Sequence, residues 1–398
     1  MKNIAVILGG RSVEHDVSII TGMQIVENMD RTKYNPIAIY IDKEGNWYTS
    51  DELLNIESYK NKDKSSYKRI YLNPQYNDRF IYVKEKKEVS GGLFKAPTIC
   101  EELVPYKRID CAVLALHGTN GEDGSVQGLL ETLGIPYSGP GILGSASGMD
   151  KILMKDVYNH YKIPTVEYKW FYRSSWKDAN EKIISGIEES FDYPVFVKPA
   201  NLGSSIGITK ANNREELINA VEVAMFYDRK IIIERAITNG REINCAVLGF
   251  EDNLETSLLE EPVGWEDLLT FDEKYLTKGS GHEGDEMHNR IIPAQVDEKI
   301  QKEIERLAKM AFNVLDCAGT ARIDFLLDED ENIYVNEINT LPGSMGFYLW
   351  EKKGIEFKEL IDRLIEIAEQ RQLDKDKSMF TFDSNLLNKT SYGAKTGK

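Results

Sequence analysis

The first third of the chain alternates short apolar runs with a segment of helical periodicity. Four runs predict strands: Ile4–Leu8, Pro36–Ile41, Cys111–Leu116 and the shorter Ile135–Tyr137. After the first run, Gly9 and Gly10 precede Val17–Met29, whose apolar residues recur at helical spacing. Near-continuous apolar strands separated by helices are typical of a parallel sheet that is covered on both faces. The pattern therefore predicts an α/β domain at the N-terminus.

Between about residues 51 and 106 the composition becomes rich in Lys, Tyr and Asn, and the periodicity weakens. We interpret this part as an insertion of short strands and loops at the periphery of the N-terminal domain. Its composition gives no indication of chemistry.

A second unit of helices and strands extends from Lys151 to about Arg235. Its elements are predicted in the order helix Lys151–Tyr161, strand Glu167–Tyr172, helix Trp176–Ser190, strand Tyr193–Lys198, helix Asn213–Phe226 and strand Lys230–Arg235. A third unit runs from Glu242 to about Gln370 and contains the predicted helices Asp297–Leu315 and Glu356–Arg371. The remaining residues, Leu373–Lys398, are polar and are expected to form a loosely attached tail.

A hairpin is predicted in the third unit between Arg322 and Asn339, where two alternating apolar–polar runs flank a polar turn. With the turn at Glu329–Asn332, Asp328 pairs with Ile333. This antiparallel register brings four polar residues onto one face and three apolar residues onto the other. The polar residues are Arg322, Asp324, Glu337 and Asn339, and the apolar residues are Ile323, Phe325 and Ile338.

In this register Asp324 lies opposite Glu337. Like charges that face each other on a sheet repel, because their Cβ atoms are roughly 4.5–5.5 Å apart. A divalent cation would offset this repulsion. Two carboxylates and the amide oxygen of Asn339 suit Mg²⁺, which takes its other ligands from water and phosphate. The alternative is an acidic surface hairpin that binds nothing.

Composition and charge narrow the class of protein. A chain of 398 residues is long enough for two to three domains, and its 41% hydrophobic and 29% charged residues are ordinary for a soluble protein. A net charge of −16 argues against a nucleic-acid partner. The 4 cysteines lack metal-ligand spacing, and no apolar run approaches the length of a membrane span. We therefore expect a cytoplasmic protein with no membrane partner.

A Gly-rich loop, Asn201–Gly207, follows the predicted strand that ends at Lys198. Glycines let backbone N–H groups approach an anion, and the serines add hydroxyl donors. Lys198 and Lys151 could supply cations for a phosphate, although a single lysine usually faces solvent. The loop lacks the Gly-Lys-Ser/Thr of a Walker P-loop, so an ordinary strand–loop connection is the alternative.

Two further motifs are ambiguous from the residues alone. Gly139–Gly144 matches the dinucleotide fingerprint G-x-G-x-x-G, but no ribose-binding acid follows at the expected distance, which favours a turn-forming glycine cluster. Glu234 ends a strand and Glu242 follows a turn. Such a strand end suits an adenine and a carboxylate suits ribose hydroxyls, but both acids also fit a surface turn.

Polar loops follow two of the N-terminal strands. Glu14 lies in R-S-V-E-H-D-V-S directly after the first strand, and His117 begins the second loop. The carboxyl edge of a parallel sheet is where α/β proteins bind ligands. The alternatives are that Ser12 or Asp16 caps a helix and that His117 merely starts one.

Taken together, these features resemble the ATP-grasp superfamily and, within it, the D-alanine–D-alanine ligases. The stretches that carry the resemblance are Gly9–Ser18, Ala115–Gly124, Gly134–Gly139, Met149–Lys151, Val197–Gly207, Glu273–Tyr275, Arg322–Phe325 and Asn336–Gly343. They come in the order and spacing of that family from residue 4 to about 370.

The resemblance implies an α/β (α+β overall) ATP-grasp fold of three domains, the first of which contains a parallel sheet. The implied ranges are 1–148, 149–235 and 236–372, followed by the tail 373–398. The implied enzyme phosphorylates the carboxylate of one D-alanine with ATP, and a second D-alanine attacks the acylphosphate to form a peptide bond for peptidoglycan precursors. A homodimer and two Mg²⁺ (or Mn²⁺) ions per site are also implied.

The resemblance assigns roles residue by residue. Phosphate contacts fall to Lys151, Lys198 and Lys274, the adenine to Glu234 and the ribose to Glu242. Ser205 and Ile237 are also assigned to ATP binding. Metal ligands fall to Asp324, Glu337 and Asn339. The first substrate falls to Glu14 and His117, its oxyanion to Arg322 and the Gly343 amide, and loop closure to Ser204 and Tyr275.

The chain departs from the family pattern on the acceptor side. After Gly343 the segment Ser344–Tyr348 runs directly into Leu349, about four residues short of what the resemblance leads one to expect. Ser344 is therefore an insecure substitute for the serine that binds the second substrate's carboxylate. The loop Leu276–Arg290 is also unusual, being rich in Gly, His and acids. The alternative function is thus a related ligase whose acceptor is another D-amino acid or a D-hydroxy acid.

Overall fold

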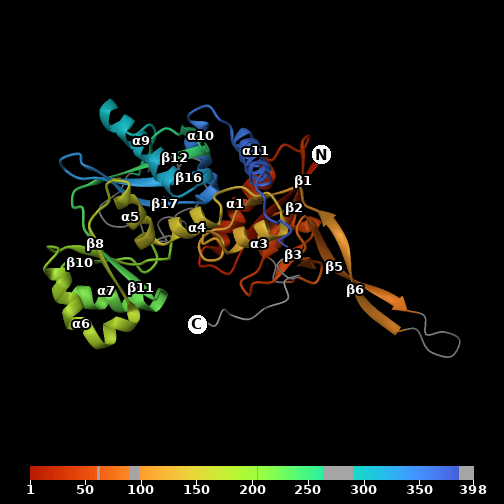
Figure 1. Ribbon diagram of the computed structural model, residues 1–398, viewed down its shortest axis with the longest axis horizontal. Helices are drawn as coiled ribbons and strands as arrows, with labels where there is room; N and C mark the ends of the chain where they lie inside the picture. Colours follow the sequence, from red (N-terminus) through yellow and green to blue (C-terminus); the bar gives the residue numbers. More distant parts are fainter. Residues whose placement is uncertain (61–62, 90–97, 204, 263–289, 385–398) are drawn as a thin grey trace, which may run out of the picture.

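The computed structural model describes residues 1–60, 63–89, 98–203, 205–262 and 290–384. Its main sheets contain seven, four and four strands, and each falls within one of the predicted ranges 1–148, 149–235 and 236–372. Figure 1 shows the second sheet at one end of the molecule, the first sheet at the other and the third sheet above and between them.

The N-terminal sheet is parallel only where the apolar runs predicted it. Strand β1 (Lys2–Gly9) pairs in parallel with β2 (Tyr34–Ile41) and β7 (Cys111–Leu114), and helix α1 (His15–Asn28) follows β1. The remaining pairs are antiparallel, so the sheet is mixed rather than fully parallel. The predicted strand Ile135–Tyr137 reduces to a single bridge at Tyr137. The domain also contains η1 (Asp51–Leu54), α2 (Glu57–Lys60), α3 (Ser125–Leu133) and α4 (Ile142–Met149).

The insertion is peripheral, as predicted, but two of its strands are long. Beyond β3 (Trp47–Thr49) it adds β4 (Lys68–Leu72), β5 (Phe80–Val89) and β6 (Thr98–Arg108) to the edge of the N-terminal sheet, in the order β6-β5-β4-β3-β2-β1-β7. The β5–β6 hairpin projects from the body (Figure 1). At its base Val83 pairs with Val104, and farther out two cross-strand ion pairs replace apolar contacts: Lys84 with Glu101 at 2.8 Å and Lys87 with Glu102 at 2.7 Å. A hairpin held by exposed charges lacks the alternation that identifies a half-buried strand.

The central sheet is antiparallel and carries its helices on one face. Its strands lie in the order β10 (Thr209–Ala211), β9 (Val195–Pro199), β11 (Lys230–Arg235) and β8 (Tyr168–Tyr172). Helices α6 (Arg173–Glu188) and α7 (Arg214–Tyr227) cover the face that carries Val197 and Ile233. Side chains alternate along a strand, so Lys198 and Glu234 face the other way, toward α5 (Lys151–His160) and the third sheet.

The third sheet contacts both the N-terminal domain and the central domain. It has the order β13 (Asn253–Thr256), β12 (Arg241–Phe250), β16 (Ala318–Leu327) and β17 (Ile333–Asn339), beside the small pair β14 (Glu261–Pro262) and β15 (Arg290–Ile291). Helix α9 (Glu298–Val314) packs on one face against Ile323 and Phe325. Helices α10 (Phe347–Glu351) and α11 (Phe357–Lys375) share one core with the other face of this sheet and with β1 and α1. Helix α11 runs past residue 372, where the tail was predicted to begin.

The β16–β17 register is as predicted only at the end that carries the polar face. Asp324 pairs with Glu337 and Arg322 with Asn339, as expected. Toward the turn the register shifts by one residue, so that Leu327 rather than Asp328 pairs with Ile333. A bulge between the two halves absorbs the extra residue, Asn336, which stands between paired Val335 and Glu337. The predicted turn was therefore wrong by one position, and the bulge restores the predicted pairing.

Candidate active site

The polar face of β16–β17 is neutralised by the protein's own cations. Arg322 donates Nε to Asp324 Oδ1 at 2.6 Å and Nη2 to Oδ2 at 2.8 Å. Asn339 donates Nδ2 to Asp324 Oδ2 at 2.8 Å. Lys151 Nζ lies 3.3 Å from Glu337 Oε2. The predicted opposition of the two carboxylates is confirmed, and Arg322 and Lys151 offset the repulsion within this structure.

Lys151 connects the Gly-rich loop with this face. It is the first residue of α5, and Asp150 caps the helix by accepting hydrogen bonds from Ile152 N and Leu153 N. The Lys151 backbone N–H donates to Ala200 O at 3.0 Å, and its Nζ donates to Leu202 O at 2.9 Å. Lys151 is therefore buried rather than solvent-facing, at the junction of the central and third sheets.

Lys198 belongs to a buried triad that includes a residue missed at the sequence level. Glu234 lies 2.7 Å from Lys198 Nζ and 3.1 Å from Lys155 Nζ, and all three side chains are buried. Burial opposes ionisation of Glu234, but the charges of Lys155 and Lys198 outweigh it and lower its pKa to about 2. Lys155 lies one helical turn after Lys151, so the i, i+4 spacing was the available signal.

The residues predicted for adenosine lie around the same strand end. Ile237 is buried in an apolar cluster with Val166 and Leu326. Glu242 lies on β12, where it pairs with Leu326 of β16. Glu234 contributes an ion-paired carboxylate, and the apolar cluster provides a surface on which a purine ring can pack.

Glu14 lies at the start of α1, beside two glycine loops. It occupies the N-cap position without a side-chain cap, and Ser12 Oγ accepts a hydrogen bond from Glu14 N at 3.1 Å. Neither Ser12 nor Asp16 caps the helix, contrary to the alternative weighed from the sequence. A Cβ on Gly118 would lie 2.5 Å from Glu14 Oε2, and one on Gly203 would lie 3.2 Å from it. The carboxylate is thus wedged between loops of two domains.

His117 is a buried connector rather than a helix-start residue, since α3 begins at Ser125. Its Nδ1 lies 2.9 Å from Leu341 O and must donate, because a carbonyl only accepts. Nε2 then accepts from the Thr21 hydroxyl at 2.9 Å. Burial lowers the His117 pKa to about 4, which keeps the ring neutral, although the Leu341 carbonyl acts in the other direction.

Thr21 and Glu122 were missed at the sequence level, and both hold loops of the site. Thr21 Oγ1 accepts a hydrogen bond from Ser344 N at 3.1 Å. Glu122 accepts from Gly118 N at 2.8 Å and from Leu341 N at 3.0 Å. Burial, followed by the charge of Glu14, raises the Glu122 pKa to about 8. Glu122 lies in the stretch Ala115–Gly124, which carried the family resemblance, but the role of Glu122 within it was not predicted.

The short segment after Gly343 forms a tight left-handed turn. Ser344, Met345 and Gly346 have φ values of 52°, 55° and 62°. Met345 is buried in the core beneath α10. This turn delivers the chain directly into α10, which explains how the segment can be so short. Ser344 contributes a backbone N–H to Thr21, and its predicted role toward a substrate stays a prediction.

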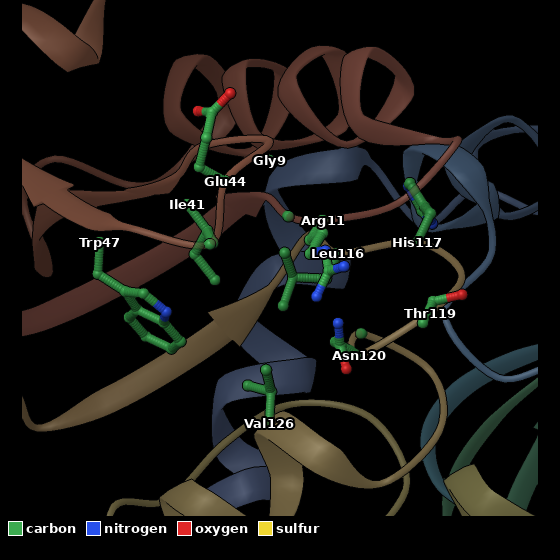
Figure 2. A pocket seen from close by; sticks show the side chains of 13 residues that line it. Gly9, Arg11, Ile41, Glu44, Trp47, Leu116, His117, Thr119, Asn120 and Val126 are labelled. Carbon is green, nitrogen blue, oxygen red and sulfur yellow. The ribbon is translucent and has the colours of Figure 1, made fainter.

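A cavity of about 250 Å³ lies at the carboxyl edge of the N-terminal sheet. Figure 2 shows it between the Gly9 loop, the Trp47 region and the loop from His117 to Asn120. Among the residues that the structure describes, its lining shares His117 with the site but includes neither Glu14 nor the polar face of β16–β17. The cavity therefore lies beside the site described above, not within it.

One more predicted motif, Gly139–Gly144, can be placed. Gly139 has a φ of 84°, and Gly141 precedes α4, so this motif forms a turn into a helix, as favoured from the sequence. Ser204, Lys274 and Tyr275 lie outside the described residues. In the described part of the chain, no helix has both the length and the apolar character needed to span a membrane.

The fold and the convergence of lysines and carboxylates between the second and third sheets define the ATP-grasp class of ligases. Models of the D-ala D-ala ligase N-terminus and C-terminus match residues 3–140 and 157–366. The chain belongs to the D-alanine–D-alanine ligase family.

Similar proteins agree with this assignment over nearly the whole chain. The D-alanine–D-alanine ligase of Thermosipho melanesiensis is 40% identical over 387 residues, which are 97% of this chain and 98% of that protein. The D-alanine–D-alanine ligase structure from Coxiella burnetii is 30% identical, with a TM-score of 0.73 over 95% of this chain and 98% of its own. The VanG D-Ala:D-Ser ligase structure from Enterococcus faecalis is 29% identical, with a TM-score of 0.75 over 92% and 99%.

Proposed function

We propose that the protein uses ATP to join two D-alanine molecules and supplies the dipeptide for peptidoglycan precursors. The observation that carries this proposal is the convergence of Lys151 from the central domain with Glu337, Asp324 and Arg322 of the third sheet. Cations and carboxylates together at a domain junction are what phosphoryl transfer requires, because its charges must be neutralised and its oxygens positioned.

The proposed reaction has two steps. A carboxylate oxygen of the first D-alanine attacks the γ-phosphorus of ATP, ADP leaves, and an acylphosphate forms. The amine of the second D-alanine attacks the acyl carbon, loses a proton, and phosphate leaves as the peptide bond forms. Glu14 would hold the ammonium group of the first D-alanine. Arg322 and the Gly343 amide would stabilise the oxyanion of the tetrahedral intermediate.

Nucleotide binding would use the groups between the two sheets. Lys151, Lys198 and Ser205 would contact phosphate, as would Lys274. Glu234, Ile237 and Glu242 would hold adenosine. Ser204 and Tyr275 would link the loops that exclude water from the acylphosphate.

The donor set of the polar face fits magnesium. Asp324, Glu337 and the Asn339 amide offer oxygen ligands, which Mg²⁺ and Mn²⁺ prefer. These residues would hold two ions, and the ions would supply positive charge to the phosphates. In this structure Arg322 is paired with Asp324 and Lys151 with Glu337, so metal binding would release both cations for contact with substrate.

The setting of the enzyme is part of the proposal. We place it in the cytoplasm, where ATP is available and where its four free cysteines, Cys100, Cys111, Cys245 and Cys317, stay reduced. The family resemblance supports a homodimer. Sedimentation of the purified protein would test the dimer, and a monomer at micromolar concentration would contradict it.

The alternative function is ligation to a different second substrate, and two observations favour it. A similar structure is named a D-Ala:D-Ser ligase, and the segment after Gly343 is short in this chain. Another D-amino acid or a D-hydroxy acid would then be the second substrate.

Mass spectrometry of products together with ADP release would test both functions. The purified protein would be incubated with ATP, Mg²⁺ and D-alanine, with or without D-serine or D-lactate. D-alanyl-D-alanine as the main product supports the first function, and a mixed product formed in preference to it supports the alternative. A failure to release ADP with any of these substrates would contradict both.

A further inference from the structure

The last residues of the two unusual acceptor-side segments of the sequence lie in contact with each other. Arg290 lies on β15, at the end of the first segment, and Tyr348 lies on α10, at the end of the second. The guanidinium carbon of Arg290 lies 4.3 Å from the centroid of the Tyr348 ring. This distance is within the range of a cation–π contact, which holds the guanidinium over the ring.

A buried carboxylate, that of Glu260, contacts both Arg290 and Tyr348. Glu260 is only 2% exposed, and its Oε1 lies 3.1 Å from Arg290 Nη1. Its Oε2 accepts from the Tyr348 hydroxyl at 3.2 Å and from Asn244 Nδ2 at 3.3 Å. A buried acid with partners on both oxygens is a rigid support, so Arg290 is preorganised before any ligand binds.

Within the described part of the chain, Arg290 keeps N–H donors for a ligand. Its side chain is 41% exposed, in contrast to Glu260. A guanidinium has five N–H donors in a planar fork, and the ion pair with Glu260 is made through Nη1. A carboxylate that approaches from solvent can therefore be bound by the rest of the fork.

The cluster also lies within electrostatic reach of the predicted oxyanion residue. Asn244, which donates to Glu260, pairs across the sheet with Asp324, the ion-pair partner of Arg322. Burial lowers the pKa of Arg322, but the charge of Asp324, followed by those of Tyr348 and Glu260, raises it. Burial and the charge of Arg322 lower the pKa of Arg290, but the charges of Tyr348 and Glu260 raise it above its usual value. In an α-amino acid the carboxylate lies two bonds from the nitrogen. An acceptor whose amine attacks a carbon held by Arg322 must place its carboxylate close by.

We propose that Arg290, held by Glu260 and Tyr348, binds the α-carboxylate of the second substrate. This inference rests on the proposed ligase function and names the group that selects the acceptor. It requires an acceptor with a free carboxylate, so both D-amino acids and D-hydroxy acids fit, and an amide of D-alanine does not.

Steady-state kinetics with separate donor and acceptor constants would test the proposal. Arg290→Met should raise the acceptor KM by about 10- to 100-fold, the range for losing a charged hydrogen bond, and leave the donor and ATP constants unchanged. D-alaninamide should be a much poorer acceptor than D-alanine for the parent enzyme. Arg290→Met should remove this preference, and Arg290→Lys should retain part of it.

Two controls separate recognition from structure. Arg306→Met removes another partly exposed arginine, paired with Glu303 at 2.6 Å on α9, and should change no constant. If Arg290→Met unfolds, the preference for D-alanine over its amide is measured in Arg290→Lys instead. An unchanged preference, or an equal rise of donor and acceptor constants, would overturn the proposal. A parent enzyme that forms no ADP with D-alanine would instead contradict the ligase function itself.

Discussion

The guanidinium of Arg322 binds both carboxylate oxygens of Asp324, its same-face neighbour on β16. One residue is proposed for the oxyanion and the other for the metal, so in this structure two catalytic groups satisfy each other. Ions that bind Asp324 must displace Arg322 from at least part of this pair. Metal binding and the release of the oxyanion residue are therefore coupled through one bidentate contact.

Glu337→Gln tests the metal proposal. The variant keeps the shape of the side chain but removes one of the two opposed charges. We expect ligase turnover to fall by about 100-fold or more, since a metal contributes several kcal/mol to the transition state. Glu329→Gln, in the exposed turn of the same hairpin, is the matched control and should retain activity. Near-normal turnover of Glu337→Gln at saturating Mg²⁺ would exclude the proposed site.

The Lys155–Glu234–Lys198 triad predicts a strong energetic coupling. Lys155→Met leaves a buried carboxylate with one cation, so unfolding free energy should fall by up to about 3 kcal/mol, the low end for breaking a buried pair. Glu234→Gln alone leaves two buried lysines without their carboxylate and should lose more, and adding Lys155→Met to that variant should recover part of its loss. Urea unfolding of the two single variants and the double variant measures the coupling.

The exposed pair Lys302–Glu298 on α9 is the control for this cycle. Its two side chains are 71% and 79% exposed, so its coupling should stay below about 0.5 kcal/mol. Equal coupling in the two pairs would mean that burial does not strengthen the triad.

Some of this site was predictable from sequence and some was not. Local alternation placed Asp324 opposite Glu337 correctly. The bulge at Asn336 could not be foreseen, because the alternation of apolar and polar residues does not show which residue of a strand is left unpaired. Lys155 was accessible through helical spacing from Lys151. Glu260 was not, because its partners lie on elements that meet only in the tertiary structure.

The fold shows the same division. Apolar runs predicted β1, β2 and β7, whose side chains are buried on both faces. The outer part of the β5–β6 hairpin escaped prediction because lysines and glutamates, not apolar residues, pair across it. Periodicity reports burial, and a strand that is stabilised by exposed charges carries little of that signal.

The neutral state of His117 predicts a loss of stability in acid. Its pKa is about 4 in the folded protein and about 6.5 when unfolded. A depressed pKa gives stability that is present above pH 6.5 and is lost as pH falls toward 4. The shift corresponds to up to about 3 kcal/mol. The unfolding free energy of the parent protein minus that of His117→Gln, measured in urea at pH 4 to 7, should decrease with this slope as the pH falls.

Glu122 acts in the opposite direction, which is why a difference measurement is needed. Its pKa is about 8 in the folded protein against an ordinary 4.5, so its contribution is full below 4.5 and is lost as pH rises through 8. Subtracting the His117→Gln curve from that of the parent protein cancels this contribution. A difference curve that is flat from pH 4 to 6.5 would contradict a neutral buried His117.

Gly118→Ala tests the proposed ammonium site at Glu14. Gly118 has a φ of +68°, and an added Cβ would lie 2.5 Å from Glu14 Oε2 and 2.7 Å from Ser12 Oγ. Gly45 has a φ of +87° with nothing within 4 Å, so Gly45→Ala imposes similar backbone strain without a clash. Both variants should lose about 1–2 kcal/mol of stability. Only Gly118→Ala displaces the carboxylate, so it alone should raise the donor KM, by about tenfold or more, as expected for weakening a charged hydrogen bond. Donor constants that change equally in the two variants would show that Glu14 does not bind the first substrate.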